Sequence, residues 1–242
     1  MIEIIAEIGA NHEGNLGTAL DLIRVAKRGG ADVAKFQLYS SRHLFGDESR
    51  VRYEWSFTDV CKLFEMCSIV GIEFMASVFD HDRLMWCESL EVGRYKIASR
   101  TAGSNPDLCK SILDTGKPAI VSRGALDTGT SWSPFDWDVP HQDTVSILNC
   151  VSKYPTLPSD LRPHHFDFET AAGWSDHGLG IGACLLAVSR GATIVEKHLT
   201  LNKIVLGGIR DHVGSMDPEE LSELRRMADD ISVVIRSIAH DR

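Results

Sequence analysis

Two lysines lie inside strongly apolar segments of the sequence, Lys35 within 29–37 and Lys96 within 95–99. An unpaired ammonium group is costly to bury, so each lysine needs an anionic partner. That partner is either the carboxylate of a neighbouring glutamate or the phosphate of a ligand, and the sequence leaves both open. Serine hydroxyls near the ends of apolar runs would complete a phosphate-binding cradle, and these are Ser77, Ser99 and Ser122.

Two histidines stand at the ends of later apolar runs, His177 just after 173–175 and His198 at the end of 193–198. A single histidine at such a place is more often a hydrogen-bonded structural residue. Two imidazoles at one rim could share a divalent metal, with carboxylates and water at the remaining positions. His12 and Glu13 follow the first apolar run, where they could cap a helix as easily as contact a ligand.

The elements that must position these residues alternate between short apolar runs and segments of helical period. The apolar runs predict strands at 2–8, 32–37, 72–77, 94–99, 118–122, 144–150, 173–175 and 193–198. The helical pattern predicts helices at 16–26, 57–70, 82–90, 106–115, 180–190 and 218–239. The last of these carries one apolar stripe, formed by Leu221, Leu224, Ala228, Ile231, Ile235 and Ile238.

Strands joined by helical crossovers form a parallel sheet, and eight of them can close on themselves. We therefore predict an α/β fold, a (β/α)8 TIM barrel of the aldolase type. An open, doubly wound sheet is the alternative. Polar residues at the carboxyl end of nearly every strand favour the barrel, because those ends meet at one mouth, where active sites of this fold gather. The segments 127–143 and 158–168 are predicted to be irregular.

Length and composition limit the possible partners. The 242 residues show no linker or repeat, so we expect one domain over 1–242. A net charge of -9 disfavours nucleic acid and anionic membranes as partners. The six cysteines form no C-x-x-C pair, which fits the reduced thiols of a cytoplasmic protein. The N-terminal run contains acidic residues and is typical of a buried strand, not of a signal peptide.

Seven segments in order resemble the barrel domain of the sialic acid (N-acetylneuraminate) synthase family: AEIGANHEG, GGADVAKFQ, YKIAS, TGKPAIVS, LNCVSKYP, GWSDHGLGIG and GATIVEKHLT. That family condenses phosphoenolpyruvate with N-acetylmannosamine or a related amino sugar. The resemblance implies a transferase-type synthase that makes a 2-keto-3-deoxy sugar acid and releases phosphate. It also implies a divalent metal, usually manganese, with magnesium, cobalt or another ion as alternatives, and it allows a homodimer.

The resemblance assigns roles to residues that match the family's motifs. The phosphoenolpyruvate-binding set is Lys35, Ser77, Lys96, Ser99 and Ser122. The metal ligands are His177 and His198, and the acceptor sugar faces Glu7, Gln37, Tyr154 and Asp211. Among all of these, the residues expected to carry the chemistry are Glu7, Lys35, Lys96, His177 and His198.

The sequence also departs from the family. The usual S-G-E after the fourth strand is Ser99-Arg100-Thr101 here, which removes an acidic residue. A histidine that is common on the sixth strand is Asn149, and the P-G-P-D loop is replaced by 207–211. The C-terminal antifreeze-like domain, which supplies an arginine to the neighbouring subunit's sugar site, is expected to be absent. Arg100, Arg123 or Arg210 could replace that positive charge.

Two other functions compete with this one. The missing acidic residue and domain would also suit a barrel that binds a sugar phosphate without turnover or serves as a partner subunit. A lysine within an apolar strand would also suit an aldolase that forms a Schiff base through Lys35 or Lys96.

Overall fold

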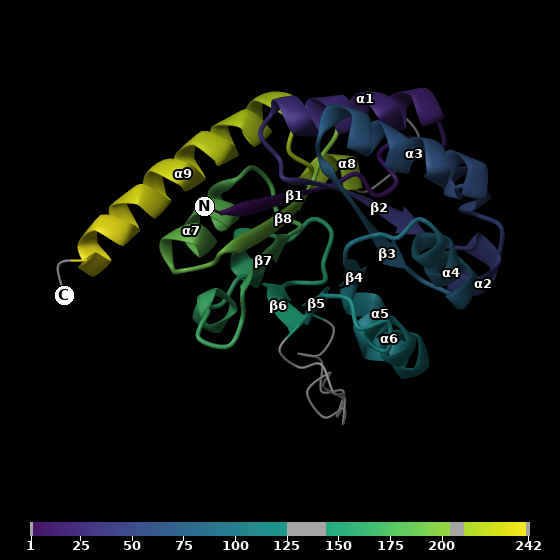
Figure 1. Cartoon of the computed structure of the whole chain (residues 1–242). Coiled ribbons are helices and arrows are strands. Elements are labelled where there is room, and N and C mark those ends of the chain that lie inside the picture. Colours follow the sequence, from purple (N-terminus) through teal and green to yellow (C-terminus); the bar gives the residue numbers. More distant parts are fainter. Residues whose placement is uncertain (1, 125–143, 204–210, 241–242) are drawn as a thin grey trace.

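The computed structural model describes residues 2–124, 144–203 and 211–240, with side chains as far as residue 238. Within these residues, parallel strands close into a barrel in chain order, each paired with its sequence neighbours (Figure 1). The strands are β1 (Glu3–Glu7), β2 (Val33–Leu38), β3 (Glu73–Val78), β4 (Tyr95–Ile97), β5 (Ala119–Ser122), β6 (Val145–Cys150), β7 (Gly173–Asp176) and β8 (Ile194–His198). Closure through β1 and β8 confirms the TIM barrel and excludes the open sheet.

Helices cover the outside of the barrel. They are α1 (Leu16–Arg28), α2 (Ser41–Phe45), α3 (Phe57–Val70), α4 (His81–Ser89), α5 (Ser99–Ser104), α6 (Pro106–Leu113), α7 (Gly182–Ser189), α8 (Asp211–Gly214) and α9 (Pro218–His240). Short 3-10 turns also occur: η1 (Val51–Tyr53), η5 (Pro158–Asp160) and η6 (Pro163–Phe166). The last two lie where an irregular segment was predicted. The other predicted irregular segment, 127–143, lies almost entirely outside the described residues.

The helices begin and end where local chemistry allows it. Asn15 caps α1, because its side chain accepts a hydrogen bond from the Thr18 backbone amide at 3.1 Å. The buried face of α1 consists of Ala19, Leu22, Ile23 and Ala26, which are all fully enclosed. Helix α3 ends at Gly71, whose φ of 71° is a left-handed conformation that glycine adopts without strain.

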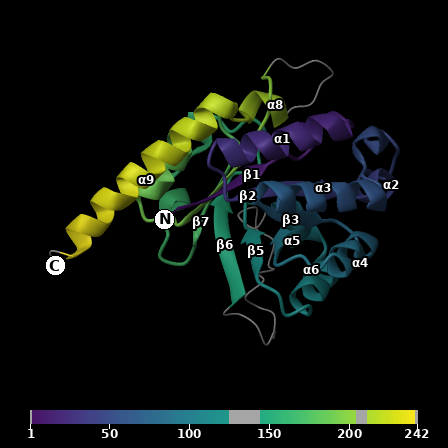
Figure 2. The same ribbon diagram turned by 45° about the horizontal axis from the view of Figure 1, so that its top comes forward.

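The apolar stripe of α9 is buried only in the first part of the helix. Leu221, Leu224 and Ala228 are fully enclosed, whereas Ile235 and Ile238 are 38% and 57% exposed. The helix packs against α7 and then continues past the edge of the barrel (Figure 2). The stripe is therefore present as predicted, but its last two members are exposed, because nothing in the described residues covers that end.

The interior of the barrel is layered. An apolar layer fills the part of the interior nearer the amino ends of the strands. It consists of Ile5, Val33, Met75, Ile120, Leu148 and Ile194. Side chains of a strand point to the same face at every second residue, so the next inward positions form a second layer. That layer is polar, and it contains Glu7, Lys35, Ser77, Lys96, Ser122 and Glu196. The apolar layer is thus the floor beneath a polar site.

Three smaller features complete the description of the fold. Strand β4 is shorter than predicted, and Ser99 is the first residue of α5, not the last of a strand. All six cysteines are free thiols, as expected. Among the described residues, no helix combines the length and the apolar character that crossing a membrane requires.

Candidate active site

A cavity of about 800 Å³ opens at the carboxyl ends of the barrel strands. It is lined by every residue that the sequence assigned to phosphoenolpyruvate, metal or sugar, from strands and from the segments that follow them. These are Glu7, Lys35, Gln37, Ser77, Lys96, Ser99, Ser122, Tyr154, His177, His198 and Asp211. Their convergence from many separate segments places them in one site; their individual roles stay predictions.

Lys35 is buried in the deep part of the cavity and is surrounded by carboxylates. It forms ion pairs with Glu7 and with Glu196, the latter at 3.3 Å, and it donates a hydrogen bond to Ser77 Oγ at 3.2 Å. Burial disfavours its charged form, but the charges of Glu196 and Glu7 outweigh that effect and leave the pKa of Lys35 raised. Lys35 is therefore a fixed cation held between two acids.

Lys96 lies nearby and is more weakly paired. Its Nζ donates to Ser122 Oγ at 2.7 Å and to the Ile97 carbonyl at 3.2 Å, and it lies 3.7 Å from Glu196 Oε1. Burial lowers the pKa of Lys96, and the attraction of Glu196 does not fully offset it. The two lysines thus differ, since the second is closer to losing its proton.

Glu196 joins the two lysines, and the sequence reasoning left it out of the site. It accepts a hydrogen bond from Ser175 Oγ at 2.7 Å, and Lys35 and Lys96 lower its pKa to about 2 despite burial. The two-residue period of a strand could have found it, because Glu196 shares a face with His198. Both lysines therefore do have glutamate partners, which was one of the two possibilities open from sequence.

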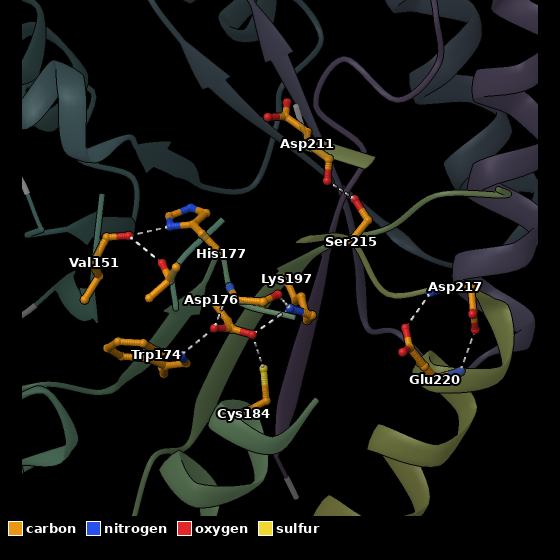
Figure 3. Close-up of polar contacts among 12 residues, drawn as sticks. Val151, Trp174, Asp176, His177, Cys184, Lys197, Asp211, Ser215, Asp217 and Glu220 are labelled. Atoms are coloured by element: carbon orange, nitrogen blue, oxygen red, sulfur yellow. Dashed lines mark hydrogen bonds and ion pairs between the residues drawn. The ribbon is translucent and has the colours of Figure 1, made fainter. Parts of the chain in front are cut away.

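His177 is held in one orientation at the rim. Its Nδ1 donates to the Val151 carbonyl at 2.9 Å, as drawn in Figure 3. This bond fixes the proton on Nδ1 and leaves the Nε2 lone pair for the Tyr154 hydroxyl, which lies at 2.7 Å. Burial, followed by the nearby His198, lowers the pKa of His177 to about 4, so the ring is neutral near pH 7.

His198 lies beside His177, with 6.0 Å between the ring centroids. Its Nδ1 is buried and has no hydrogen-bond partner among the described residues. Gly9 makes room for the ring: its φ is 52°, and a Cβ there would stand 3.0 Å from His198 Cε1. A glycine after β1 is therefore required both by the turn and by the histidine that it borders.

The histidine pair fits a divalent metal as two of its ligands. Metal-bound imidazole must be neutral and is normally oriented by a hydrogen bond to its other nitrogen, as His177 is. An imidazole nitrogen binds such an ion at about 2.1 Å, so rings this close can share one. The described residues hold no group of three or more His, Cys, Asp or Glu side chains suited to a metal. The carboxylate ligands considered from sequence are not found there, and water or substrate oxygens would have to complete the coordination.

The outer part of the cavity contains three residues that the sequence did not assign, Tyr39, Phe45 and Arg50. Ser99 and Ser152 are joined there by a hydrogen bond of 2.9 Å between their hydroxyl groups. Of the arginines proposed from sequence to replace a missing charge, Arg100 lines the cavity.

Arg123 does not line the cavity. Its Nε donates to Asn149 Oδ1 at 2.5 Å, while Asn149 itself donates to the His165 and Asp167 carbonyls. Arg210 lies outside the described residues.

His12 and Glu13 are not part of the cavity lining. The ring of His12 packs on Trp55 at a centroid distance of 4.1 Å, and its Nδ1 accepts from the Gly14 amide. Glu13 faces His212 at 3.3 Å. Asn15 caps α1 in place of His12 and Glu13, and neither residue lines the cavity.

Comparison with known proteins identifies the family. The model of the NeuB family matches residues 22–239. The chain belongs to the NeuB family. N,N'-diacetyllegionaminic acid synthase of Legionella pneumophila is 34% identical over 97% of this chain and 73% of its own length. Human N-acetylneuraminate-9-phosphate synthase is 33% identical over 92% of this chain and 68% of its own length.

Solved structures agree with the sequence matches. The N-acetylneuraminic acid synthetase of Leptospira borgpetersenii, solved with citrate, superposes with a TM-score of 0.82 at 31% identity, over 97% of this chain and 85% of that one. A DAHP synthase of Thermotoga maritima, at 14% identity and a TM-score of 0.68, shares the fold. The predictions of the family and of a synthase-type enzyme are confirmed.

Proposed function

We propose that this NeuB-family barrel condenses phosphoenolpyruvate with an amino sugar or a related aldehyde, giving a 2-keto-3-deoxy sugar acid and phosphate. The observation that carries the proposal is the cavity in which two lysines, several hydroxyls and two imidazoles meet. The names of the relatives, which are synthases of acidic sugars, support the same reaction class. Free thiols on all six cysteines support a reducing compartment such as the cytoplasm.

The deep part of the cavity suits the phosphate and carboxylate of phosphoenolpyruvate. Lys35 with Ser77 and Lys96 with Ser122 form two donor pairs that are already joined by hydrogen bonds. Charge-assisted hydrogen bonds from such groups are stronger than neutral ones. In the absence of substrate, Glu7 and Glu196 offset the two positive charges, so the cavity keeps its donors in place without an unpaired ammonium.

His177 and His198 would hold the divalent ion, manganese by family resemblance. When bound, such an ion polarises a carbonyl oxygen as a Lewis acid. Tyr154 and the Val151 carbonyl keep the His177 ring in the tautomer that this requires. Gln37 and Asp211, which line the same cavity, would contact the sugar.

The proposed reaction forms one carbon–carbon bond and breaks the bond between carbon 2 of phosphoenolpyruvate and the phosphate oxygen. Carbon 3 of phosphoenolpyruvate forms a bond to the aldehyde carbon, whose oxygen takes up a proton and becomes a hydroxyl. Water adds to carbon 2, and the tetrahedral product loses phosphate by cleavage of the C–O bond. Glu7 is suited to proton transfer, because its Oε1 is buried at the cavity without a hydrogen-bond partner among the described residues. The lysines and hydroxyls stabilise the charge of the departing phosphate.

Phosphate release gives the direct test. Purified protein is incubated with phosphoenolpyruvate, a manganese salt and a panel of aldehydes that includes N-acetylmannosamine. We expect release that depends on both the metal and one aldehyde, together with a sugar acid detected by mass spectrometry. No release with any aldehyde in the presence of manganese would exclude the condensation, and tight phosphoenolpyruvate binding without turnover would then favour the non-catalytic barrel.

One observation favours a second candidate, an aldolase that forms a Schiff base. Burial lowers the pKa of Lys96, and a neutral amine is the form that attacks a carbonyl. Reduction with borohydride in the presence of a keto acid would trap an adduct on Lys96, which peptide mass spectrometry locates. A protein that turns over phosphoenolpyruvate but traps no adduct would eliminate this candidate.

A further inference from the structure

Two arginines stand together at the outer part of the cavity, and the proposed reaction gives them no role. Arg50 directly precedes η1, and Arg100 is the second residue of α5, so they come from distant parts of the chain. Both guanidinium groups contact the ring of Phe45, at 5.8 Å for Arg50 and 5.1 Å for Arg100. Both residues line the cavity. One aromatic ring thus brings two positive charges to the same part of the rim.

Neither guanidinium is neutralised within the described part of the chain. No ion pair links Arg50 or Arg100 to a carboxylate there, including Asp211, which lines the same cavity. The acidic group of the adjoining loop is engaged elsewhere: Glu54 accepts from the Ser41 amide and faces Arg83 at 3.9 Å. The contrast with the deep lysines is clear, because each of those has a carboxylate within 4 Å.

The arginines lie at the far end of the cavity from Lys35. Lys35, Gln37 and Tyr39 alternate along one face of the β2 segment and all line the cavity. At about 3.3 Å per residue, Tyr39 stands roughly 13 Å beyond Lys35. The Tyr39 ring meets Phe45 edge-on at 5.7 Å, which fixes the arginine pair at that height. A substrate that reaches the arginines must therefore extend outward from the reacting centre.

We propose that Arg50 and Arg100 form a subsite for an anionic group, a phosphate monoester or a carboxylate, at the end of the acceptor remote from its aldehyde. The inference rests on the proposed condensation and adds the class of acceptor. Guanidinium groups suit both anions, because their paired N–H donors match two oxygens at once. Packing on Phe45 orders both side chains before the ligand binds, which lowers the entropy lost on binding. A negatively charged acceptor also explains unpaired cations in a chain of net charge -9.

The test uses acceptors that differ in one group: N-acetylmannosamine, its 6-phosphate and its 6-carboxylate. With phosphoenolpyruvate saturating, we expect one anionic acceptor to exceed the neutral sugar at least tenfold in kcat/KM. Which of the two wins distinguishes phosphate from carboxylate. Arg50→Gln and Arg100→Gln should each raise the KM for that acceptor about tenfold, and the double variant should abolish the preference. The KM for phosphoenolpyruvate should stay within twofold.

Arg52→Gln is the matched control. Arg52 belongs to the same loop and also stacks on an aromatic ring, that of Tyr53 at 4.8 Å, but it does not line the cavity. It should change none of these constants. Equal kcat/KM for neutral and anionic acceptors, or an equal loss for all three in the double variant, would overturn the subsite. A rise in KM that is confined to phosphoenolpyruvate would also overturn the subsite, because the arginines would then bind that substrate and not the acceptor.

Calorimetric binding of the same three sugars, without phosphoenolpyruvate, separates the subsite from the reaction. If no sugar is turned over but one anionic sugar binds and the double variant loses that binding, the condensation fails while the subsite stands. If the neutral sugar is turned over and neither anionic sugar binds more tightly than it does, the condensation stands and the subsite is wrong.

Discussion

Strand β8 carries buried ionic groups on both of its faces, and they differ in what surrounds them. Glu196 points into the barrel, where it meets Lys35 and Lys96. The next residue, Lys197, points to the outside of the barrel wall, where it meets Asp176 at 2.6 Å (Figure 3). Both groups are almost wholly removed from solvent. Burial of an ion pair alone therefore does not distinguish a site from a structural element.

The outer pair, Lys197 and Asp176, has several further hydrogen-bond partners. Asp176 accepts hydrogen bonds from Trp174 Nε1, the Gly178 amide and Cys184 Sγ in addition to Lys197, and Lys197 donates to the Gly178 carbonyl as well. Its partners come from β7, β8 and α7, so it ties the helix layer to the barrel. The inner group leaves Glu7 Oε1 without a partner among the described residues and borders an open cavity. Unsatisfied polar atoms next to free space are what indicate function.

The largest difference between the two groups should appear when Lys96 is replaced. In Lys96→Met, we expect kcat for phosphate release to fall about 10³-fold, because a charged donor to the phosphate is lost. The free energy of unfolding should fall by only about 1–2 kcal/mol, since Glu196 keeps Lys35 at 3.3 Å. Steady-state kinetics and urea unfolding measure the two effects.

Lys62→Met, on the exposed face of α3, serves as the control for loss of one positive charge. A Lys96→Met protein that retains full kcat, or one that unfolds as readily as an outer-pair variant, would show that the inner group is also structural.

Replacing Lys197, the outer lysine, should lower the stability of the protein more than its activity. Lys197→Met leaves Asp176 buried without its counter-charge, and breaking such a pair costs about 3–5 kcal/mol of unfolding free energy. We expect a lower urea midpoint at an unchanged m-value. The fraction that stays folded should keep the KM for phosphoenolpyruvate, because Lys197 does not line the cavity. A stable variant with impaired KM would reverse the assignment of the two groups.

Replacing both outer partners should restore part of the lost stability. In Asp176→Leu combined with Lys197→Met, no buried charge is left unpaired, and well-packed apolar replacements of ion pairs are often neutral. We expect the double variant to lie about 2–3 kcal/mol below the parent protein, because the Trp174 Nε1 and Gly178 amide donors lose their acceptor. The difference from the sum of the single variants, measured as a double-mutant cycle, gives the coupling energy. Additive single effects would mean that Asp176 acts mainly through Trp174 and Gly178.

The comparison also shows why the fold was easier to predict than the site. Strand and helix positions follow from local periodicity, which the sequence displays directly, and closure follows from the strand number. The exceptions depend on tertiary surroundings. The far end of α9 has the apolar pattern of a buried helix, but it extends past the barrel, so Ile238 is exposed.

The lysines and the histidines of the site were predictable because each lies within a strand or directly at its carboxyl end. Lys35, Lys96 and the two histidines need only the barrel geometry to meet. Arg50 was not predictable, since it lies in a loop whose path depends on packing with Phe45. The strand period predicts that Glu196 and Lys197 lie on opposite faces of β8. Only the closed barrel shows which of these two faces borders the cavity.

The smallest expected effect concerns a buried base that has no opposite charge. His12 is enclosed against Trp55, and burial lowers its pKa from 6.5 to about 3. Below pH 6.5 the His12 imidazole is protonated in the unfolded chain but stays neutral in the folded protein. The free energy of unfolding therefore falls as pH decreases from 6.5 toward 3, and His12 has no effect on it above 6.5. The slope from this group is at most about 1.4 kcal/mol per pH unit.

His12→Gln keeps an acceptor for the Gly14 amide and should flatten that slope, whereas the surface variant His81→Gln should not. Urea unfolding between pH 5 and 8 measures it, and parallel curves for His12→Gln and the parent protein would show that His12 is protonated in the folded state.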